Sequence, residues 1–324
     1  RIWPSDAHRD GDGEVVLGGV PVSDLTAQFG TPLYVVDEIE FVRSAKQVKE
    51  ALEGAALDIG TEATVYYAGK AFLCTEVVRW ADRLGLNVDV ASGGELAVAL
   101  AAGIDAKRIG LHGNNKSAAE IGRAVSAGVG AIVIDSEIEI ERIAATAGAQ
   151  GRVQPVRIRA NIGIHADTHE FLATAREDQK FGIAMEDVPT LVAKIRSIGN
   201  LEFLGLHSHI GSQIYSREGF VEAVRRTVDL HAELNKQAAV SELNLGGGFG
   251  VNYKPGDQAP LVTEFAEDIA AAVKAECQKH GIAVPVLAFE PGRYIAANPG
   301  ITLYTAGTIK DVVLSDHGDA VRKY

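Results

Sequence analysis

Eight short runs rich in apolar and β-branched residues alternate with stretches whose apolar residues recur at helical spacing. The strand-like runs are Ala63–Ala68, Leu86–Val90, Arg108–Leu111, Ala131–Asp135, Val153–Asn161, Leu201–His209, Glu242–Leu245 and Val286–Glu290. The helical stretches include Phe72–Leu84, Gly94–Ala102, Ala118–Ala127, Ile138–Ala147 and Phe220–Leu234. Strand and helix repeated eight times predict an α/β fold, the (β/α)8 TIM barrel, whose usual length of about 250 residues matches the span 38–290.

The residues on either side of this span favour strands. Gly300–Ala306 and Thr308–Leu314 have the pattern of two strands with no helix between them. A β-like run at Val15–Val22 is expected to pair with them. We therefore predict three parts: an N-terminal segment, 1–37, whose strands join a flanking β domain; the barrel, 38–290; and the truncated start of a C-terminal β domain, 291–324.

The composition excludes several classes of protein. Lys and Arg total 31 against 43 Asp and Glu, and the net charge of −12 argues against a nucleic-acid partner. The sequence contains no run of roughly 18 apolar residues, so it predicts no membrane span. Two cysteines are too few for a disulfide framework, so a cytoplasmic location is expected. Because the chain begins at Arg1 and its one methionine is Met185, we expect trimming at both ends.

Polar residues collect where the predicted strands end. A barrel of this kind carries its active site at the C-terminal ends of its strands. The residues expected there are Lys70, Asp89, His112, Asn114, Asp135, Arg159, Asn161, His207, His209, Gly246–Gly250, Glu290 and Arg293. This shared position is the main physical indication of a functional site.

Two of these strand ends have chemistry of their own. Lys70 follows Tyr66-Tyr67-Ala68-Gly69, an apolar and aromatic setting that suits an amine used for Schiff-base formation. The alternative is a lysine that merely reaches water. The loop Gly246–Gly250 exposes backbone amides that can approach an anion. It is a poor dinucleotide fingerprint, because Pro255 and Pro260 disfavour a helix directly after it.

The sixth and eighth runs add histidines and a carboxylate. His207 and His209 are two residues apart on a strand, so both rings point to one side of the sheet. One of them could stack on a cofactor ring beside a phosphate at Ser212; a metal pair and two structural histidines are the alternatives. Glu290 could keep a pyridine nitrogen protonated, and Arg293 could bind a carboxylate. A Glu290–Arg293 surface ion pair is the structural alternative.

The motifs YYAGKAF, HGNNKS, DQKFGI, HSHIGSQ, LGGGFG and EPGR, in this order and spacing, resemble those of the diaminopimelate decarboxylase family. These are fold type III, alanine-racemase-like enzymes that use pyridoxal 5'-phosphate. The resemblance runs from about Pro32 to Tyr324. It implies decarboxylation of meso-2,6-diaminopimelate to L-lysine and carbon dioxide in lysine biosynthesis.

The resemblance also implies roles for individual residues. Lys70 carries the cofactor through a Schiff base, His209 packs on the face of its ring, and Glu290 faces the pyridine nitrogen. Arg293 contacts the carboxylate of the amino-acid substrate. The phosphate is bound by Ser212, Gly247, Gly248, Pro291, Gly292 and Arg293. Asp89, Asn161 and His207 are further candidates at the same rim.

Other interpretations of these motifs remain open. A racemase of this fold places an arginine at the pyridine nitrogen, so Glu290 favours a decarboxylase. The substrate could instead be ornithine or arginine, or the chain could be a non-catalytic pyridoxal-phosphate-binding relative. A metal-dependent hydrolase built on His207 and His209 is the least favoured, and we expect no metal.

The resemblance further implies parts that this sequence does not contain. The family takes a protonating cysteine, in a CESxD-like motif, from its C-terminal β domain, and it completes the site across a homodimer. Cys74 and Cys277 do not match that motif and are interpreted as buried helical cysteines. We therefore expect that this chain alone does not turn over. The loop 163–182, with His165 and His169, is either a lid or an ordinary solvated loop.

Overall fold

The computed structural model describes residues 2–164, 180–313 and 320–323. These residues form two compact units. The larger unit is Phe41–Ala297, and the smaller consists of Trp3–Glu40 and Asn298–Tyr324.

The larger unit is built on a closed barrel of parallel strands. The strands are β5 (Ala63–Ala68), β6 (Asn87–Val90), β7 (Ile109–Leu111), β8 (Ala131–Ile134), β9 (Gln154–Asn161), β11 (Leu201–His207), β12 (Glu242–Asn244) and β13 (Val286–Phe289). They follow one another around the ring, and the pairings of β13 with β5 and of β8 with β9 close it. Each strand lies within a run predicted from the sequence, which confirms the (β/α)8 barrel. A short strand, β10 (Ile183–Ala184), also pairs with β9.

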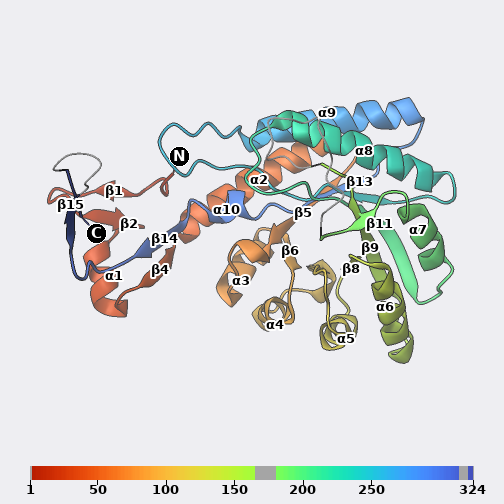
Figure 1. Ribbon diagram of the computed structural model, residues 1–324, viewed down its shortest axis with the longest axis horizontal. Helices are drawn as coiled ribbons and strands as arrows, with labels where there is room; N and C mark the ends of the chain where they lie inside the picture. Colours follow the sequence, from red (N-terminus) through yellow and green to blue (C-terminus); the bar gives the residue numbers. More distant parts are fainter. Residues whose placement is uncertain (1, 165–179, 314–319, 324) are drawn as a thin grey trace. The chain divides into compact units, whose positions relative to one another are not determined.

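Helices alternate with these strands (Figure 1). They are α2 (Glu38–Asp58), α3 (Thr75–Arg83), α4 (Gly93–Ala102), α5 (Ala118–Ala127), α6 (Glu137–Ala149), α7 (Val188–Arg196), α8 (Arg217–Asn235), α9 (Val262–His280) and α10 (Arg293–Ala296), with 3-10 turns η1 (Gly69–Ala71) and η2 (Ala106–Arg108). The five predicted helical stretches are all helices. Local signals set their ends: Ser117 and Glu120 form a capping box before α5, and Gly128 ends it in the left-handed conformation.

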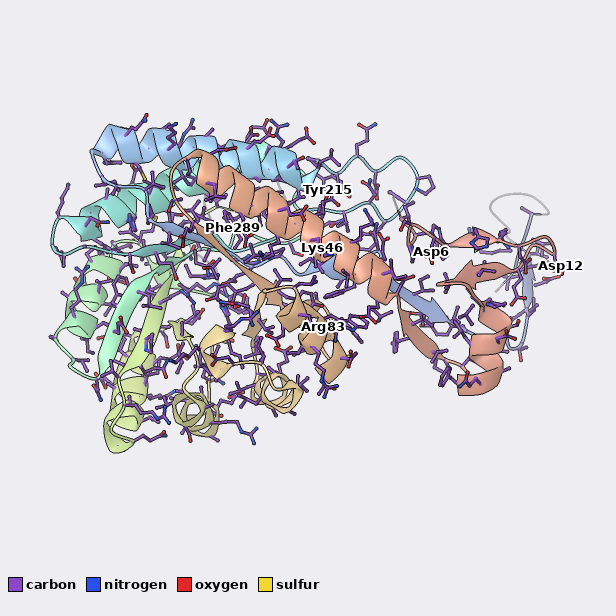
Figure 2. All side chains as sticks on the ribbon, turned by 180° about the vertical axis from the view of Figure 1, so that it is seen from behind. Asp6, Asp12, Lys46, Arg83, Tyr215 and Phe289 are labelled. Atoms are coloured by element: carbon purple, nitrogen blue, oxygen red, sulfur yellow. The ribbon has the colours of Figure 1, made fainter. Side chains whose placement is uncertain are left out.

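The core lies inside the barrel and between the barrel and its helices. Figure 2 labels Phe289 of β13, which is 2% exposed, whereas Lys46 of α2 and Arg83 of α3 lie exposed on the outer helices. Buried Arg157 pairs with Glu242 and donates to the hydroxyl of Tyr66 at 2.9 Å, which satisfies an ion inside the barrel. In the described part of the chain, no helix is long and apolar enough to cross a membrane.

The smaller unit contains short antiparallel sheets. Strands β1 (His8–Arg9), β2 (Val15–Leu17) and β3 (Val20–Pro21) form one sheet, followed by α1 (Val22–Phe29). Strand β14 (Gly300–Leu303) pairs with β4 (Leu33–Val36), and β15 (Asp311–Val313) pairs with β17 (Val321–Lys323). The expected pairing of Val15–Val22 with the tail strands is therefore wrong. The run Val15–Val22 contains Gly18 and Gly19, which turn β2 back onto β3 and give it a local partner.

Two glycines of the larger unit provide a test of its packing. A Cβ atom on Gly205 of β11 would lie 2.0 Å from the carbonyl oxygen of Glu242, while a Cβ on Gly122 of α5 meets nothing within 4 Å. Gly205→Ala is expected to lower the free energy of unfolding by about 1–3 kcal/mol through overpacking. Gly122→Ala is the matched control and is expected to raise it by about 0.5–1 kcal/mol, since alanine favours a helix interior.

Urea unfolding of both variants checks these expectations. Equal effects of the two substitutions would contradict the close approach of β11 to β12.

Candidate functional site

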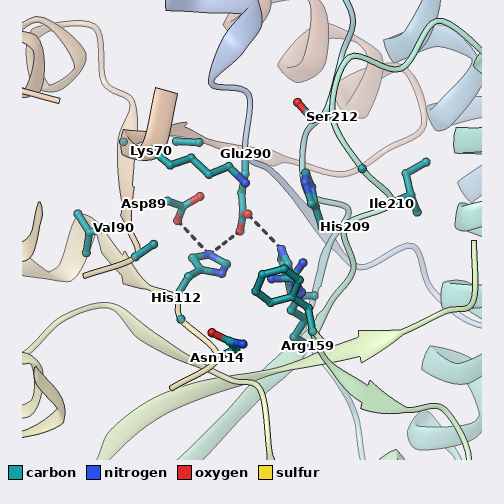
Figure 3. Close-up of a pocket in the computed structure, with 17 residues that line it drawn as sticks. Lys70, Asp89, Val90, His112, Asn114, Arg159, His209, Ile210, Ser212 and Glu290 are labelled. Carbon is teal, nitrogen blue, oxygen red and sulfur yellow. Dashed lines mark hydrogen bonds and ion pairs between the residues drawn. The ribbon is translucent and has the colours of Figure 1, made fainter. Parts of the chain in front are cut away.

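The C-terminal strand ends of the larger unit surround a cavity of about 460 Å³ (Figure 3). The strand ends are level because Ala68 pairs with Asp89, and His207 pairs with both Arg159 and Asn244. Of the residues predicted at this rim, the cavity is lined by Lys70, Asp89, His112, Asn114, Arg159, His207, His209 and Glu290, and Ser212, the predicted phosphate-binding residue, lines it too. The size is within the range of small-molecule sites.

Lys70 enters this cavity from the 3-10 turn that follows β5. Its side chain is exposed and points toward Glu290 in Figure 3, so the expected apolar enclosure of the amine is wrong. Tyr66 and Tyr67 are buried, and the Tyr67 hydroxyl donates to the Phe72 carbonyl at 2.6 Å. The aromatic neighbours thus hold the backbone of the turn and leave the amine in the open cavity. Gly69 is required there, because a Cβ would lie 2.7 Å from the Asp89 carbonyl oxygen.

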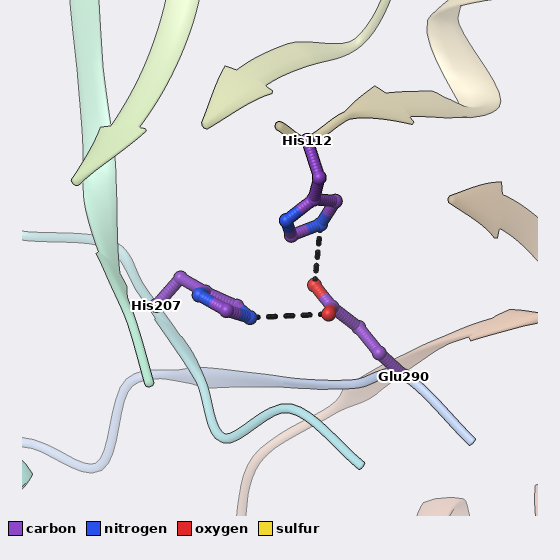
Figure 4. A group of neighbouring side chains, drawn as sticks. All are labelled: His112, His207 and Glu290. Atoms are coloured by element: carbon purple, nitrogen blue, oxygen red, sulfur yellow. Dashed lines mark hydrogen bonds and ion pairs between the residues drawn. The ribbon is translucent and has the colours of Figure 1, made fainter. Parts of the chain in front are cut away.

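The carboxylate of Glu290, directly after β13, is held by three donors. His112 Nε2 lies 3.1 Å from Oε1, Asn244 Nδ2 donates to Oε1 at 2.6 Å, and His207 Nε2 lies 3.1 Å from Oε2. Figure 4 shows the two imidazoles meeting the two oxygens from different strands. A carboxylate has about four lone-pair sites, so three donors leave one for a group in the cavity. Burial raises the pKa of Glu290, but the histidines outweigh this effect and hold it well below its usual range.

The two histidines on Glu290 differ in charge. Burial lowers the pKa of His112, but Glu290 and Asp89 outweigh burial and raise it to about 9. Burial lowers the pKa of His207 to about 4, against the attraction of Glu290. At neutral pH, therefore, His112 is an imidazolium and His207 is neutral. Burial beside Glu290 raises the pKa of Asp89 to about 7.

A second cavity of about 410 Å³ shares Lys70, His209, Ser212 and Glu290 with the first. Its other lining residues are Ala71, Gly248, Tyr253, Gly292, Arg293, Ala296 and Ala297. Arg293 donates to the Ser212 hydroxyl at 3.1 Å and to the Tyr253 hydroxyl at 2.7 Å. A guanidinium and a hydroxyl at one end of the cavity are donors that suit a phosphate.

The glycine loop after β12 packs closely on its neighbours. A Cβ on Gly247 would lie 2.2 Å from the Glu290 carbonyl oxygen, and one on Gly248 would lie 2.4 Å from that of Gly211. Gly248 also has a φ of +110°, which side-chain-bearing residues rarely adopt. These glycines bring the loop against Glu290 and the segment after β11. Gly248 lines the second cavity, whereas Gly247 lines neither. As expected, no helix follows this loop until Val262.

The remaining predicted residues have varied positions. Asn161 lines neither cavity and accepts from the Gly163 amide at 3.1 Å. The Pro291 carbonyl accepts from the Ala68 amide at 3.1 Å, and Gly292 lines the second cavity. Glu290 and Arg293 have different partners, so the alternative of a surface ion pair between them is wrong.

One of the two cysteines departs from the expectation that both are buried in helices. Cys277 is buried in α9, whereas Cys74 is half-buried and precedes α3 as its N-cap residue. Both are free. His165 and His169, with most of the 163–182 loop, lie outside the described residues.

Several residues at the site were not assigned a role from the sequence. His112 and Arg159 stood at strand ends, but nothing in the linear pattern indicated that His112 reaches Glu290. Asn244 bridges Glu290 and the Gly246 amide, and its place just before the glycine loop is a usable signal. Tyr253 and Phe181 lie on loops. The Arg159 guanidinium packs over the Phe181 ring, 4.6 Å from its centroid, and Arg159 and Phe181 together line one side of the first cavity.

An amine, a buried carboxylate and a phosphate-type donor set in two adjoining cavities fit pyridoxal 5'-phosphate. Residues 40–297 match the model of the pyridoxal-dependent decarboxylase pyridoxal-binding domain. The chain belongs to this decarboxylase family. Its cofactor is therefore pyridoxal 5'-phosphate.

Named relatives agree with this membership. Diaminopimelate decarboxylase of Mycobacterium leprae (strain TN) is 46% identical, with 100% of this chain and 68% of that protein covered. The enzyme of Mycobacterium tuberculosis (strain ATCC 25618 / H37Rv) is 44% identical over 100% of this chain and 72% of its own. The crystal structure of the M. jannaschii enzyme with L-lysine superposes with a TM-score of 0.86 at 30% identity, covering 96% of this chain and 72% of that one.

The Ser212–Arg293 pair makes a testable prediction. Ser212→Ala and Arg293→Gln should each weaken binding of pyridoxal 5'-phosphate about 10- to 100-fold, since each removes a hydrogen bond to a charged group. Binding of pyridoxal, which has no phosphate, should change less than about twofold. Equilibrium dialysis of both ligands measures the difference.

Arg225→Gln is the control, because Arg225 is an exposed residue of α8 that pairs only with Glu222 and Glu276 among the described residues. If the Ser212 and Arg293 variants weakened pyridoxal and its phosphate equally, the phosphate assignment would be wrong.

Proposed function

We propose that this chain carries the decarboxylase site that converts meso-2,6-diaminopimelate to L-lysine and carbon dioxide in lysine biosynthesis. The observation that carries the proposal is the ionised Glu290 carboxylate facing a cavity that also holds the Lys70 amine. The choice of substrate is supported by diaminopimelate decarboxylases that are 44–46% identical across the whole chain.

When bound, pyridoxal 5'-phosphate supplies an electron sink for the pair released as the carbon–carboxylate bond breaks. Lys70 is the amine in the cavity that holds the cofactor and yields to the substrate amine. With the cofactor bound, Glu290 would face the pyridine nitrogen and would favour its protonated form, because the carboxylate is itself kept ionised. His209, whose ring lies beside the glycine loop, packs on the face of the ring.

The phosphate and the substrate are placed by the other end of the site. Ser212, Gly248, Gly292 and Arg293, which line the second cavity, would hold the phosphate, and Arg293 would also contact the substrate carboxylate. Loss of carbon dioxide would leave an electron pair on the α-carbon, and a proton must bind there to give L-lysine. The donor that the family resemblance implies is a cysteine of a motif that this sequence does not contain. Asp89, with a pKa raised to about 7 by burial and Glu290, lines the first cavity beside His112.

We further propose that the site is shared in a homodimer. Lys70, Ser212 and Arg293 are exposed, and Tyr253 is 51% exposed, so the cavities are open to water on this side. A second copy covering the opening would exclude water, which strengthens the electrostatic interactions of the site. Sedimentation at increasing concentration should give a mass of two chains; a single chain at all concentrations would contradict this proposal.

A cytoplasmic location is also proposed. It is supported by the free state of Cys74 and Cys277, which suits a reducing compartment.

Lys70 provides the direct test of the function. The chain mixed with pyridoxal 5'-phosphate should develop a visible absorption band that is lost in Lys70→Ala. Lys274→Ala, an exposed lysine of α9, is the matched control and should keep the band. Carbon dioxide release from diaminopimelate should exceed release from ornithine or arginine.

Each outcome bears on a different part of the proposal. A band that survives Lys70→Ala would overturn the assignment of the amine. Faster release from ornithine or arginine would overturn the substrate and leave the cofactor site intact.

A further inference from the structure

Glu290 lies beside two further ionisable side chains, Asp89 and His112, in addition to facing the cavity. Asp89 on β6 and Glu290 after β13 both face His112 Nε2, at 3.5 Å and 3.1 Å. Both carboxylates are buried, and two buried negative charges beside the same imidazole disfavour each other. An imidazolium between them removes most of that cost.

The two histidines on Glu290 have different hydrogen-bonding capacity. Nδ1 of His207 is buried and has no hydrogen-bond partner among the described residues. A protonated His207 would leave a buried N–H donor unsatisfied, so its neutral form, which donates through Nε2 alone, fits the site. The rings of His112 and His207 stand edge to face with centroids 4.9 Å apart. Both therefore reach the one Glu290 carboxylate, and only one of the two needs to carry a positive charge.

His112 is also firmly held. Its amide donates to the Val90 carbonyl at 2.7 Å. Buried Lys116, four residues on, donates to the carbonyls of Gly113 and Val133 and pairs with Glu139. The segment from His112 to Lys116 is therefore anchored at both ends, which fixes the backbone position from which the imidazole reaches Glu290.

We propose that His112, paired with Asp89, is a positioning residue that carries a fixed positive charge and keeps Glu290 an anion aimed into the cavity, while His207 supplies only a neutral hydrogen bond. This inference rests on the proposed function in one respect: it takes Glu290 as the partner of the cofactor's pyridine nitrogen. Among the described residues, the other titratable or charged groups near this cluster are Lys70, Arg159 and His209, which line the cavity, and buried Arg157 and Tyr66, which interact with Asp89.

The direction of the pH effect follows from the raised pKa of His112. Its charge is fully present below the ordinary histidine value and is lost as the pH rises through about 9. The advantage of His112 over a neutral donor should therefore persist while His112 is charged and disappear above about pH 9, and it should change near pH 7, where Asp89 beside it titrates.

The first experiment titrates the histidines of the whole chain by NMR, before and after loading with pyridoxal 5'-phosphate. The His112 signal, identified by its loss in His112→Gln, should titrate near 9, and that of His207 near 4. Asp89→Asn, close to isosteric, should lower the His112 midpoint by about one unit or more. A His112 midpoint at or below the ordinary value, or one unmoved by Asp89→Asn, would overturn the proposal.

The second experiment compares two matched variants. His112→Gln and His207→Gln each replace an imidazole donor to Glu290 by a neutral amide, but only the first removes a charge. Dialysis at pH 7 should show cofactor binding weakened about tenfold in His112→Gln and less than about threefold in His207→Gln. The difference between wild type and His112→Gln should close as the pH rises through about 9.

Equal losses in both variants would assign His112 a merely structural role. Absence of cofactor binding in the wild-type chain would instead overturn the proposed function. The histidine titration would still decide the charge of His112, so the two failures are distinguishable.

Discussion

The buried carboxylate of Glu290 is the constraint on which the site depends. Its charge is removed from water, and removing one partner of such a buried ion typically costs about 3–5 kcal/mol. Three donors satisfy it, from the ends of β7, β11 and β12: His112, His207 and Asn244. Because the donors come from three strands, the carboxylate is satisfied only when the barrel has closed with those ends level.

The rest of the site is arranged around this carboxylate. The glycine loop approaches the Glu290 backbone so closely that a side chain on Gly247 has no room. Asn244 bonds both the carboxylate and the Gly246 amide, so it couples the loop that leads to Gly248 to the charge at the cavity wall. Arg293, three residues after Glu290, carries a guanidinium that can bind an anion. In the proposed function, Glu290 and Arg293 would therefore hold the two ends of the cofactor from one turn.

Much of the barrel could be predicted from the sequence, because each buried parallel strand is a short apolar run and each helix has its own period. The rim could also be predicted, because polar residues follow these apolar runs at the C-terminal ends of the strands, where a barrel has its active site. The pairing of β4 with β14 could not be predicted, since it joins residues more than 260 apart with no local signal. Val15–Val22 was assigned the wrong partner because its two glycines form a local turn.

The site was predicted in part. Lys70, His209, Ser212, Glu290 and Arg293 follow from motifs, and the structure brings them together in adjoining cavities. The contact of His112 with Glu290 could not be predicted, because it depends on how the ends of β7 and β13 face each other across the barrel. Lys70 was expected among aromatic side chains. The last four residues of β5 are buried, but the strand ends at Ala68, and the 3-10 turn that follows places the lysine in the open cavity.

Glu290 is central to the proposed chemistry as an anion that keeps the pyridine nitrogen of the cofactor protonated. The most direct measurement is the ¹⁵N chemical shift of that nitrogen in pyridoxal 5'-phosphate labelled at the ring and bound to the wild-type chain at neutral pH. We predict the shift of a protonated pyridine, and Glu290→Gln should change it to that of an unprotonated ring. An unprotonated ring nitrogen in the wild-type chain would contradict this role of Glu290.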